Sequence, residues 1–62
     1  MINQKNKRGN TPLHIAVRKG YVAISELLLE SGANKDYKNK KGQTVLEIAR
    51  ENGNTHLELA LM

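Results

Sequence analysis

The side chains that could perform acid–base or metal chemistry are two histidines, His14 and His56, one aspartate, Asp36, and five glutamates. Nucleophilic catalysis needs a serine, threonine or cysteine beside a base, and no such grouping stands at a motif spacing; cysteine is absent from the sequence. The acids are not spaced as a calcium loop or as a carboxylate pair. We therefore expect no enzyme activity, no catalytic residue and no cofactor.

A metal site would have to be built around the same two histidines. His14 and His56 would need further ligands from Glu47 or Glu51 to complete a coordination shell. A spare glutamate on a helix face is far more often solvated than coordinating. We expect no metal site.

The basic residues are gathered into two polar stretches rather than spread along the chain. The formal net charge is +4, and the two clusters are Lys5, Lys7 and Arg8, then Lys35, Lys38, Lys40 and Lys41. Such clusters could bind phosphates without sequence specificity, but Tyr21 and Tyr37 are the only aromatic residues available to stack on bases. The alternative is that they only keep exposed turns soluble. Nucleic-acid binding is thus a secondary hypothesis.

The length limits the chain to one small unit. A 62-residue chain buries only about 60% of the surface that its unfolded form exposes, so we expect marginal stability. The first residues carry no signal-peptide pattern, and apolar runs such as Leu27 to Leu29 are far too short for a membrane span. These features predict no membrane partner and an intracellular location, cytoplasmic or nuclear.

An internal repeat organises the sequence. When residues 1–29 are laid over residues 34–62, ten positions are identical at one offset of 33 residues. The pairs include Gly9 with Gly42, Thr11 with Thr44 and Leu13 with Leu46. One tetrapeptide differs instructively: T-P-L-H at residues 11–14 becomes T-V-L-E at residues 44–47. The repeat predicts that each copy folds into the same elements.

Each copy reads as turn, helix, turn, helix. Thr11 is a good N-cap, Pro12 suits the first helical position, and Lys19 and Gly20 are typical of a helix end. We predict helices at about 11–19, 22–30 and 44–52, with a fourth from about residue 55, and no strand. The apolar positions predicted to form the core are Leu13, Ile15, Ala16, Val22, Ile24, Leu27, Leu28, Leu46, Ile48, Ala49, Leu57 and Leu61.

The stretch G-N-T-P-L-H-I-A-V-R-K-G, followed by L-L-L-E-S-G-A-N, resembles the ankyrin repeat in both period and T-P-L-H-x-A signature. The resemblance implies an all-α solenoid of paired antiparallel helices joined by hairpin-like finger loops. It divides the chain into the tail of a preceding finger (residues 1–5), a first repeat (6–38) and a second, incomplete repeat (39–62). Val45, Glu47, Arg50 and Glu58 depart from the pattern, as in a repeat that caps an array.

Fewer than two repeats are present, whereas about three are needed for stability. We therefore expect a piece from the C-terminal end of a longer array. By itself it should be weakly stable as a monomer or should stack end to end with other copies.

The resemblance also implies the function, which is protein binding through the finger tips and the exposed part of the first helix of each repeat. The corresponding residues here are Lys7, Arg8, Asn10, Arg18, Lys19, Lys38, Lys40, Lys41, Gln43, Glu51 and Asn52, with Tyr37 as a candidate aromatic anchor. Seven of the first eleven are basic, so we predict an acidic partner surface. The alternative to a binding role is a purely structural stacking unit. Tyr37 could equally serve only to cover neighbouring turns.

His14 and Glu47 share the third helical position behind a threonine cap. T-x-x-E is a capping box, in which Glu47 returns to the backbone of Thr44. The resemblance implies that His14 bonds Thr11 and the neighbouring finger in the same place. We expect structural capping roles for Thr11, His14, Thr44 and Glu47.

Overall fold

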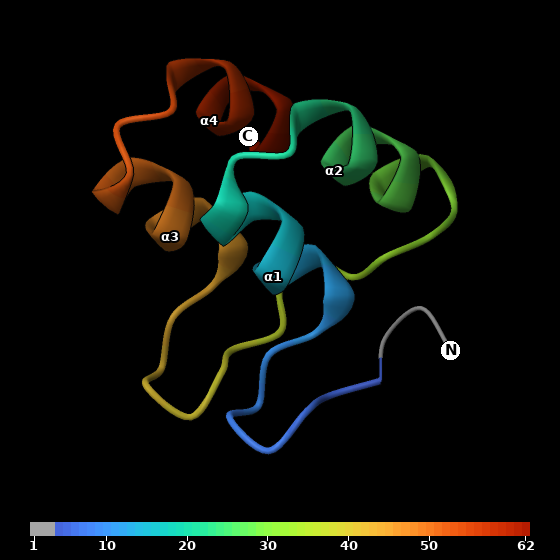
Figure 1. Cartoon of the computed structure of the whole chain (residues 1–62), viewed down its shortest axis with the longest axis vertical. Coiled ribbons are helices and arrows are strands. Elements are labelled where there is room, and N and C mark those ends of the chain that lie inside the picture. Colours follow the sequence, from blue (N-terminus) through green and yellow to red (C-terminus); the bar gives the residue numbers. More distant parts are fainter. Residues whose placement is uncertain (1–3) are drawn as a thin grey trace.

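The structure, a computed structural model, describes residues 4–62. Its four helices are α1 (Pro12–Lys19), α2 (Val22–Glu30), α3 (Val45–Glu51) and α4 (Thr55–Leu61). They form two helix–turn–helix pairs that pack side by side, α1 against α3 and α2 against α4, while two loops extend together from the α1 and α3 side (Figure 1). Within residues 4–62 no strand forms, so the predicted all-α architecture is confirmed. The predicted finger tail at residues 1–5 lies partly outside the described residues.

The helix boundaries follow from local capping chemistry. Thr11 is extended (φ −82°, ψ 168°) and Pro12 opens α1, where no amide partner is needed. Gly20 ends α1 in the left-handed region (φ 76°), and the next amide, that of Tyr21, donates to the carbonyl of Ala16 at 2.9 Å. Thr44 repeats the extended cap before α3 (φ −86°, ψ 168°). In the part of the chain that is described, no helix has the length and apolar character needed to cross a membrane.

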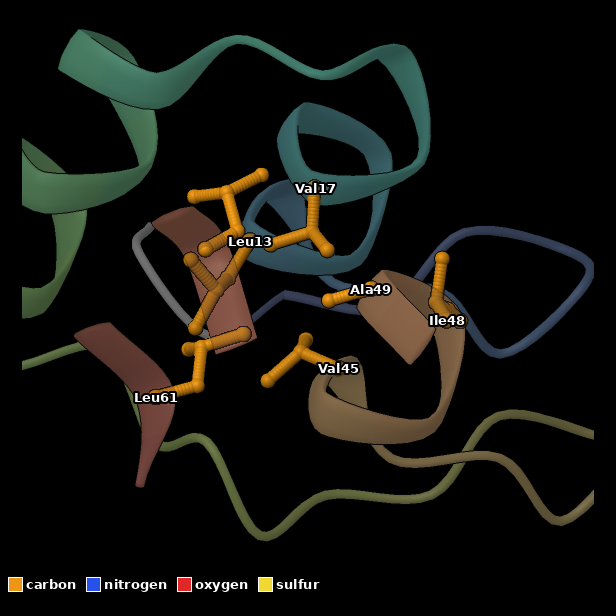
Figure 2. Packing of buried hydrophobic residues seen from close by; sticks show 7 residues of the cluster. Leu13, Val17, Val45, Ile48, Ala49 and Leu61 are labelled. Carbon is orange, nitrogen blue, oxygen red and sulfur yellow. The ribbon is translucent and has the colours of Figure 1, made fainter. Parts of the chain in front are cut away.

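The core lies between the two helix pairs. Its cluster of buried apolar side chains comes from α1, α3 and α4: Leu13, Val17, Val45, Ile48, Ala49, Leu57 and Leu61. In Figure 2 the side chains of Leu13 and Val17 point toward those of Val45 and Leu61. Burial of aliphatic side chains is the main favourable term here, at about 25 cal/mol per Å². The second pair therefore depends on the first for its core.

Two residues predicted to be in the core are exposed. Ile24 and Leu27 on α2 expose 50% and 61% of their surface. Ile24 occupies the position of Leu57 in the other copy, which is 0% exposed because the first helix pair covers it. On the side of Ile24 no helix within residues 4–62 plays that part. Conversely Val45, absent from the predicted core, is completely buried.

Candidate functional site

Each of the two basic clusters sits on a turn that an asparagine holds in shape. In the first finger turn (residues 6–10), Asn6 Oδ1 accepts from the amides of Arg8 (2.9 Å) and Asn10 (3.0 Å). In the second finger turn (residues 39–43), Asn39 Oδ1 accepts from the amides of Lys41 (2.9 Å) and Gln43 (3.0 Å). In each turn the asparagine side chain thus accepts hydrogen bonds from backbone amides that have no backbone acceptor in the turn. The lysines at the tips are therefore carried by fixed backbone.

The two finger turns are bonded directly to each other. The amide of Lys40 donates to the carbonyl of Arg8 at 3.1 Å, and Asn39 Nδ2 donates to Asn10 Oδ1 at 3.0 Å. Gly9 makes this approach possible, because a Cβ there would lie 2.9 Å from the Lys40 nitrogen. The two turns form one continuous surface.

A groove of about 640 Å³ runs between these turns and helices α1 and α3. Residues from both repeats line it: Lys7, Arg8, Asn10, Arg18, Asn39, Lys40, Lys41, Gln43, Ile48, Glu51 and Asn52. Asn52 at the end of α3 fixes one wall, since its Nδ2 donates to the carbonyl of Arg18 at 2.9 Å. The groove thus crosses the boundary between the two helix pairs.

Most of the residues predicted for partner binding lie in this groove. Nine of them line it, whereas Lys19, Tyr37 and Lys38 do not. Tyr37 is half-buried, and the ammonium group of Lys5 lies 4.8 Å from the centre of its ring. That contact fits the alternative in which Tyr37 covers a neighbouring turn. Asn39 was not predicted; its signal was the asparagine repeated three residues before each turn glycine.

The charge in the groove is strongly unbalanced. Five lining side chains are cationic, namely Lys7, Arg8, Arg18, Lys40 and Lys41, and one is acidic, Glu51. Glu51 Oε1 accepts from Gln43 Nε2 at 3.0 Å, which holds the carboxylate at one wall. Positive charge lining a concave surface concentrates the potential there and attracts anionic groups.

His14 serves the framework behind the groove. It is 1% exposed; Nδ1 accepts from the amide and hydroxyl of Thr11 at 3.3 and 2.8 Å, so Nε2 is left to donate to the carbonyl of Gln43 at 3.1 Å. Glu47 caps Thr44 within its own turn and is exposed. The two residues share the capping position, but only His14 also links the two repeats.

The other histidine lies away from the groove. His56 Nε2 is 3.0 Å from Glu26 Oε1, and both side chains are largely open to solvent. Among residues 4–62 no three histidine, aspartate or glutamate side chains come together in a way that could hold a metal ion. This pair can link α2 to α4 but has no further ligand.

Comparison with known proteins identifies the repeat. The family model described as "Ankyrin repeats (3 copies)" matches residues 1–62. Among similar proteins, a "Transient receptor potential cation channel subfamily A member 1 homolog" of Caenorhabditis elegans is 38% identical over 86% of this chain and 4% of its own length. A "Putative ankyrin repeat protein FPV219" of fowlpox virus is 38% identical over 94% of this chain and 13% of its own length.

A human "Palmitoyltransferase ZDHHC13" is 49% identical over 73% of this chain, which corresponds to 7% of that protein. The relatives thus carry the matched segment as a small part of much longer chains with unlike names. What they share with this chain is the repeat, a class of structure that generally binds other proteins. The chain belongs to the ankyrin repeat family.

Proposed function

We propose that the chain is a non-catalytic protein-interaction module whose groove binds an acidic protein surface. The observation that carries this proposal is that five cationic side chains and one carboxylate line a single concave surface. One backbone and one side-chain hydrogen bond between the finger turns hold that surface in shape, so little conformational freedom is lost when a partner binds.

Electrostatics should govern the encounter with the partner. Exposed charges attract over roughly 8 Å at physiological ionic strength, and complementary charge mainly raises the association rate. Acidic groups on a partner would therefore be drawn toward the finger turns, and added salt should weaken the binding.

A matched pair of double charge reversals tests the proposal. Lys40→Glu with Lys41→Glu changes two groove lysines, whereas Lys19→Glu with Lys38→Glu makes the same change in net charge outside the groove. Binding of a fluorescein-labelled glutamate-rich peptide would be followed by anisotropy at several salt concentrations. We expect the groove variant to lose most of its affinity and the control to keep most of it. Equal losses would contradict a role for the groove.

Nucleic-acid binding is the alternative for the same lysines. None of the residues that line the groove is aromatic, so stacking of single-stranded bases there has no platform. The peptide experiment should include duplex and single-stranded oligonucleotides of matched charge. Tighter binding of both oligonucleotides than of the peptide, lost on reversal of Lys40 and Lys41, would favour this alternative.

A structural stacking role has a separate observation in its favour. Ile24 and Leu27 expose apolar surface on α2, and the counterpart of Ile24 in the second repeat, Leu57, is buried. The opposite face is polar: Arg50 and Glu58 stand where Val17 and Ser25 stand in the first repeat, and they form an ion pair at 3.5 Å. A second copy stacked end to end would have to bury that pair, which is costly. We therefore expect a different ankyrin repeat, rather than a second copy of this chain, to pack on the apolar surface of Ile24 and Leu27.

A further inference from the structure

A network of hydrogen bonds between side chains runs through the groove, and each of its bonds has a defined donor and acceptor. Asn39 Nδ2 donates both to Asn10 Oδ1 (3.0 Å) and to Gln43 Oε1 (3.2 Å). Gln43 Nε2 in turn donates to Glu51 Oε1 at 3.0 Å. Four groove residues, Asn10, Asn39, Gln43 and Glu51, are thus joined across the repeat boundary.

The direction of these hydrogen bonds is set by the backbone. Asn39 Oδ1 accepts from the amides of Lys41 and Gln43, so this end of the side chain must be the oxygen. The Asn39 nitrogen then has to donate, and its partners on Asn10 and Gln43 have to be oxygens. No other orientation of these amides keeps all the bonds.

The side-chain nitrogen of Asn10 is a hydrogen-bond donor that this network does not use. Asn10 is only 7% exposed, its Oδ1 is occupied by Asn39, and its Nδ2 has no hydrogen-bond partner among residues 4–62. No buried side-chain nitrogen or oxygen in that part of the chain lacks a partner, so Nδ2 must reach solvent. Asn10 is one of the residues that line the groove, together with five basic side chains, so an anion bound there would lie within reach of this donor.

We propose that Asn10 anchors a carboxylate of an acidic peptide segment: the carboxylate accepts a hydrogen bond from Asn10 Nδ2, and its negative charge is attracted by the surrounding basic side chains. This inference rests on the proposed function and specifies the ligand group. A solvent-reaching donor on a residue that is otherwise buried can exchange water for an acceptor of a ligand, and a bond to a charged acceptor is worth more than one to a neutral group. Arg8 and Arg18 add forked donors suited to a carboxylate.

Glu51 adds polarity to the same site. It is the one acid that lines the groove, and Gln43 occupies only its Oε1. The remaining oxygen accepts but cannot donate, so it favours a basic residue of the ligand near the anchored carboxylate. The site should therefore prefer an acidic segment that carries one basic residue at a fixed distance from the anchored carboxylate.

Two isosteric substitutions test the anchor, with a third as control. Asn10→Asp keeps the bond from Asn39 but turns an oxygen toward the groove. Asn39→Asp keeps the turn bonds but can no longer donate, so Asn10 must donate inward and present its oxygen, and Gln43 can donate to either the introduced carboxylate or Glu51. Asn34→Asp makes the same change in charge outside the groove, where Oδ1 accepts from the amide of Asp36 at 2.8 Å.

Affinity for a labelled glutamate-rich peptide should fall about tenfold or more in the first two variants relative to the control. In the unsubstituted chain, the side-chain amide resonances of Asn10 should shift on titration with the same peptide. A peptide series with one arginine moved along the sequence should show one preferred position, and Glu51→Gln should abolish that preference.

The outcomes separate this inference from the proposed function. If Asn10→Asp and Asn39→Asp bind like Asn34→Asp while the Lys40 and Lys41 reversal still weakens binding, the anchor is wrong and the acidic-partner proposal stands. If the unsubstituted chain does not bind the peptide at all, both are wrong. Should Asn10→Asp fail to fold by circular dichroism, Asn39→Asp and the Asn10 resonances decide the question.

Discussion

His14 Nε2 lies 3.1 Å from the carbonyl oxygen of Gln43, twenty-nine residues further along the chain. This bond joins the cap of α1 to the turn that precedes α3, and the imidazole is buried. A carboxylate at the same position can repeat the capping contact, as Glu47 does, but it cannot donate to a carbonyl.

Substitution of His14 should therefore cost more than substitution of its counterpart in the second repeat. We expect His14→Glu to lower the free energy of unfolding by about 1–3 kcal/mol, because it removes the bond between the two repeats and places a charged carboxylate at a buried position. Glu47→Gln, which keeps a capping side chain on an exposed position, should change it by less than about 0.5 kcal/mol. Urea unfolding followed by circular dichroism measures both. Equal effects would show that the link between repeats contributes nothing.

The contact between the finger turns can be tested with two glycines of nearly equal backbone geometry. Gly9 and Gly42 have φ of 76° and 77°, but only at Gly9 would a Cβ meet another residue, 2.9 Å from the Lys40 nitrogen. Both alanine variants should suffer the left-handed strain, about 1 kcal/mol or more. Gly9→Ala should lose roughly a further 1–3 kcal/mol from the clash. If the two variants unfold at the same urea concentration, the turns do not depend on their mutual contact.

Because Ile24 on α2 is exposed, alanine substitution there should cost less stability than at Leu57, the equivalent position of the second repeat. Leu57→Ala removes a fully buried side chain and should cost about 2–5 kcal/mol, enough to unfold a chain of this size. Ile24→Ala removes a half-exposed side chain and should cost about 1 kcal/mol or less. Circular dichroism at low temperature would separate a folded Ile24 variant from an unfolded Leu57 variant. A large loss at Ile24 would mean that its face is covered in solution.

Placing the residues of the first repeat on the polar face formed by Arg50 and Glu58 should allow copies of the chain to associate. Arg50→Val with Glu58→Ser replaces the ion pair by the residues that the first repeat has at those positions, Val17 and Ser25. The new surface should stack on Ile24 and Leu27 of another copy, so sedimentation velocity should show association that rises with concentration. Adding Ile24→Glu should reverse it. A double variant that stays monomeric at all concentrations would contradict this account of the polar face.

The helices were predictable because their signals are local. Threonine caps, Pro12 and the glycine at position 20 fixed where α1 begins and ends without reference to the rest of the fold. The basic composition of the groove was predicted through the family resemblance, and the structure brings nine of the suggested residues to one surface.

Burial and the hydrogen-bond network of the groove were not predictable in the same way. Ile24 has the helical spacing of a core residue, but whether that spacing leads to burial depends on a neighbour that the local pattern does not contain. Val45 was interpreted as a departure from the usual proline, although its buried position suits any compact apolar side chain. The bond from Asn39 to Asn10 forms only when two turns 33 residues apart meet, so the sequence of a single turn does not predict it.

The bond from the Lys40 amide to the Arg8 carbonyl uses main-chain atoms alone, so it is indifferent to which side chains the two residues carry. The asparagines at positions 6 and 39 and the glycines at 9 and 42 shape the turns, whereas the tip residues 7, 8, 40 and 41 are left out of that task. Substitution of the tip residues should consequently change which partner is bound without changing the backbone of the turns. In the finger turns, one set of residues determines the shape of the backbone and another supplies the charge of the surface.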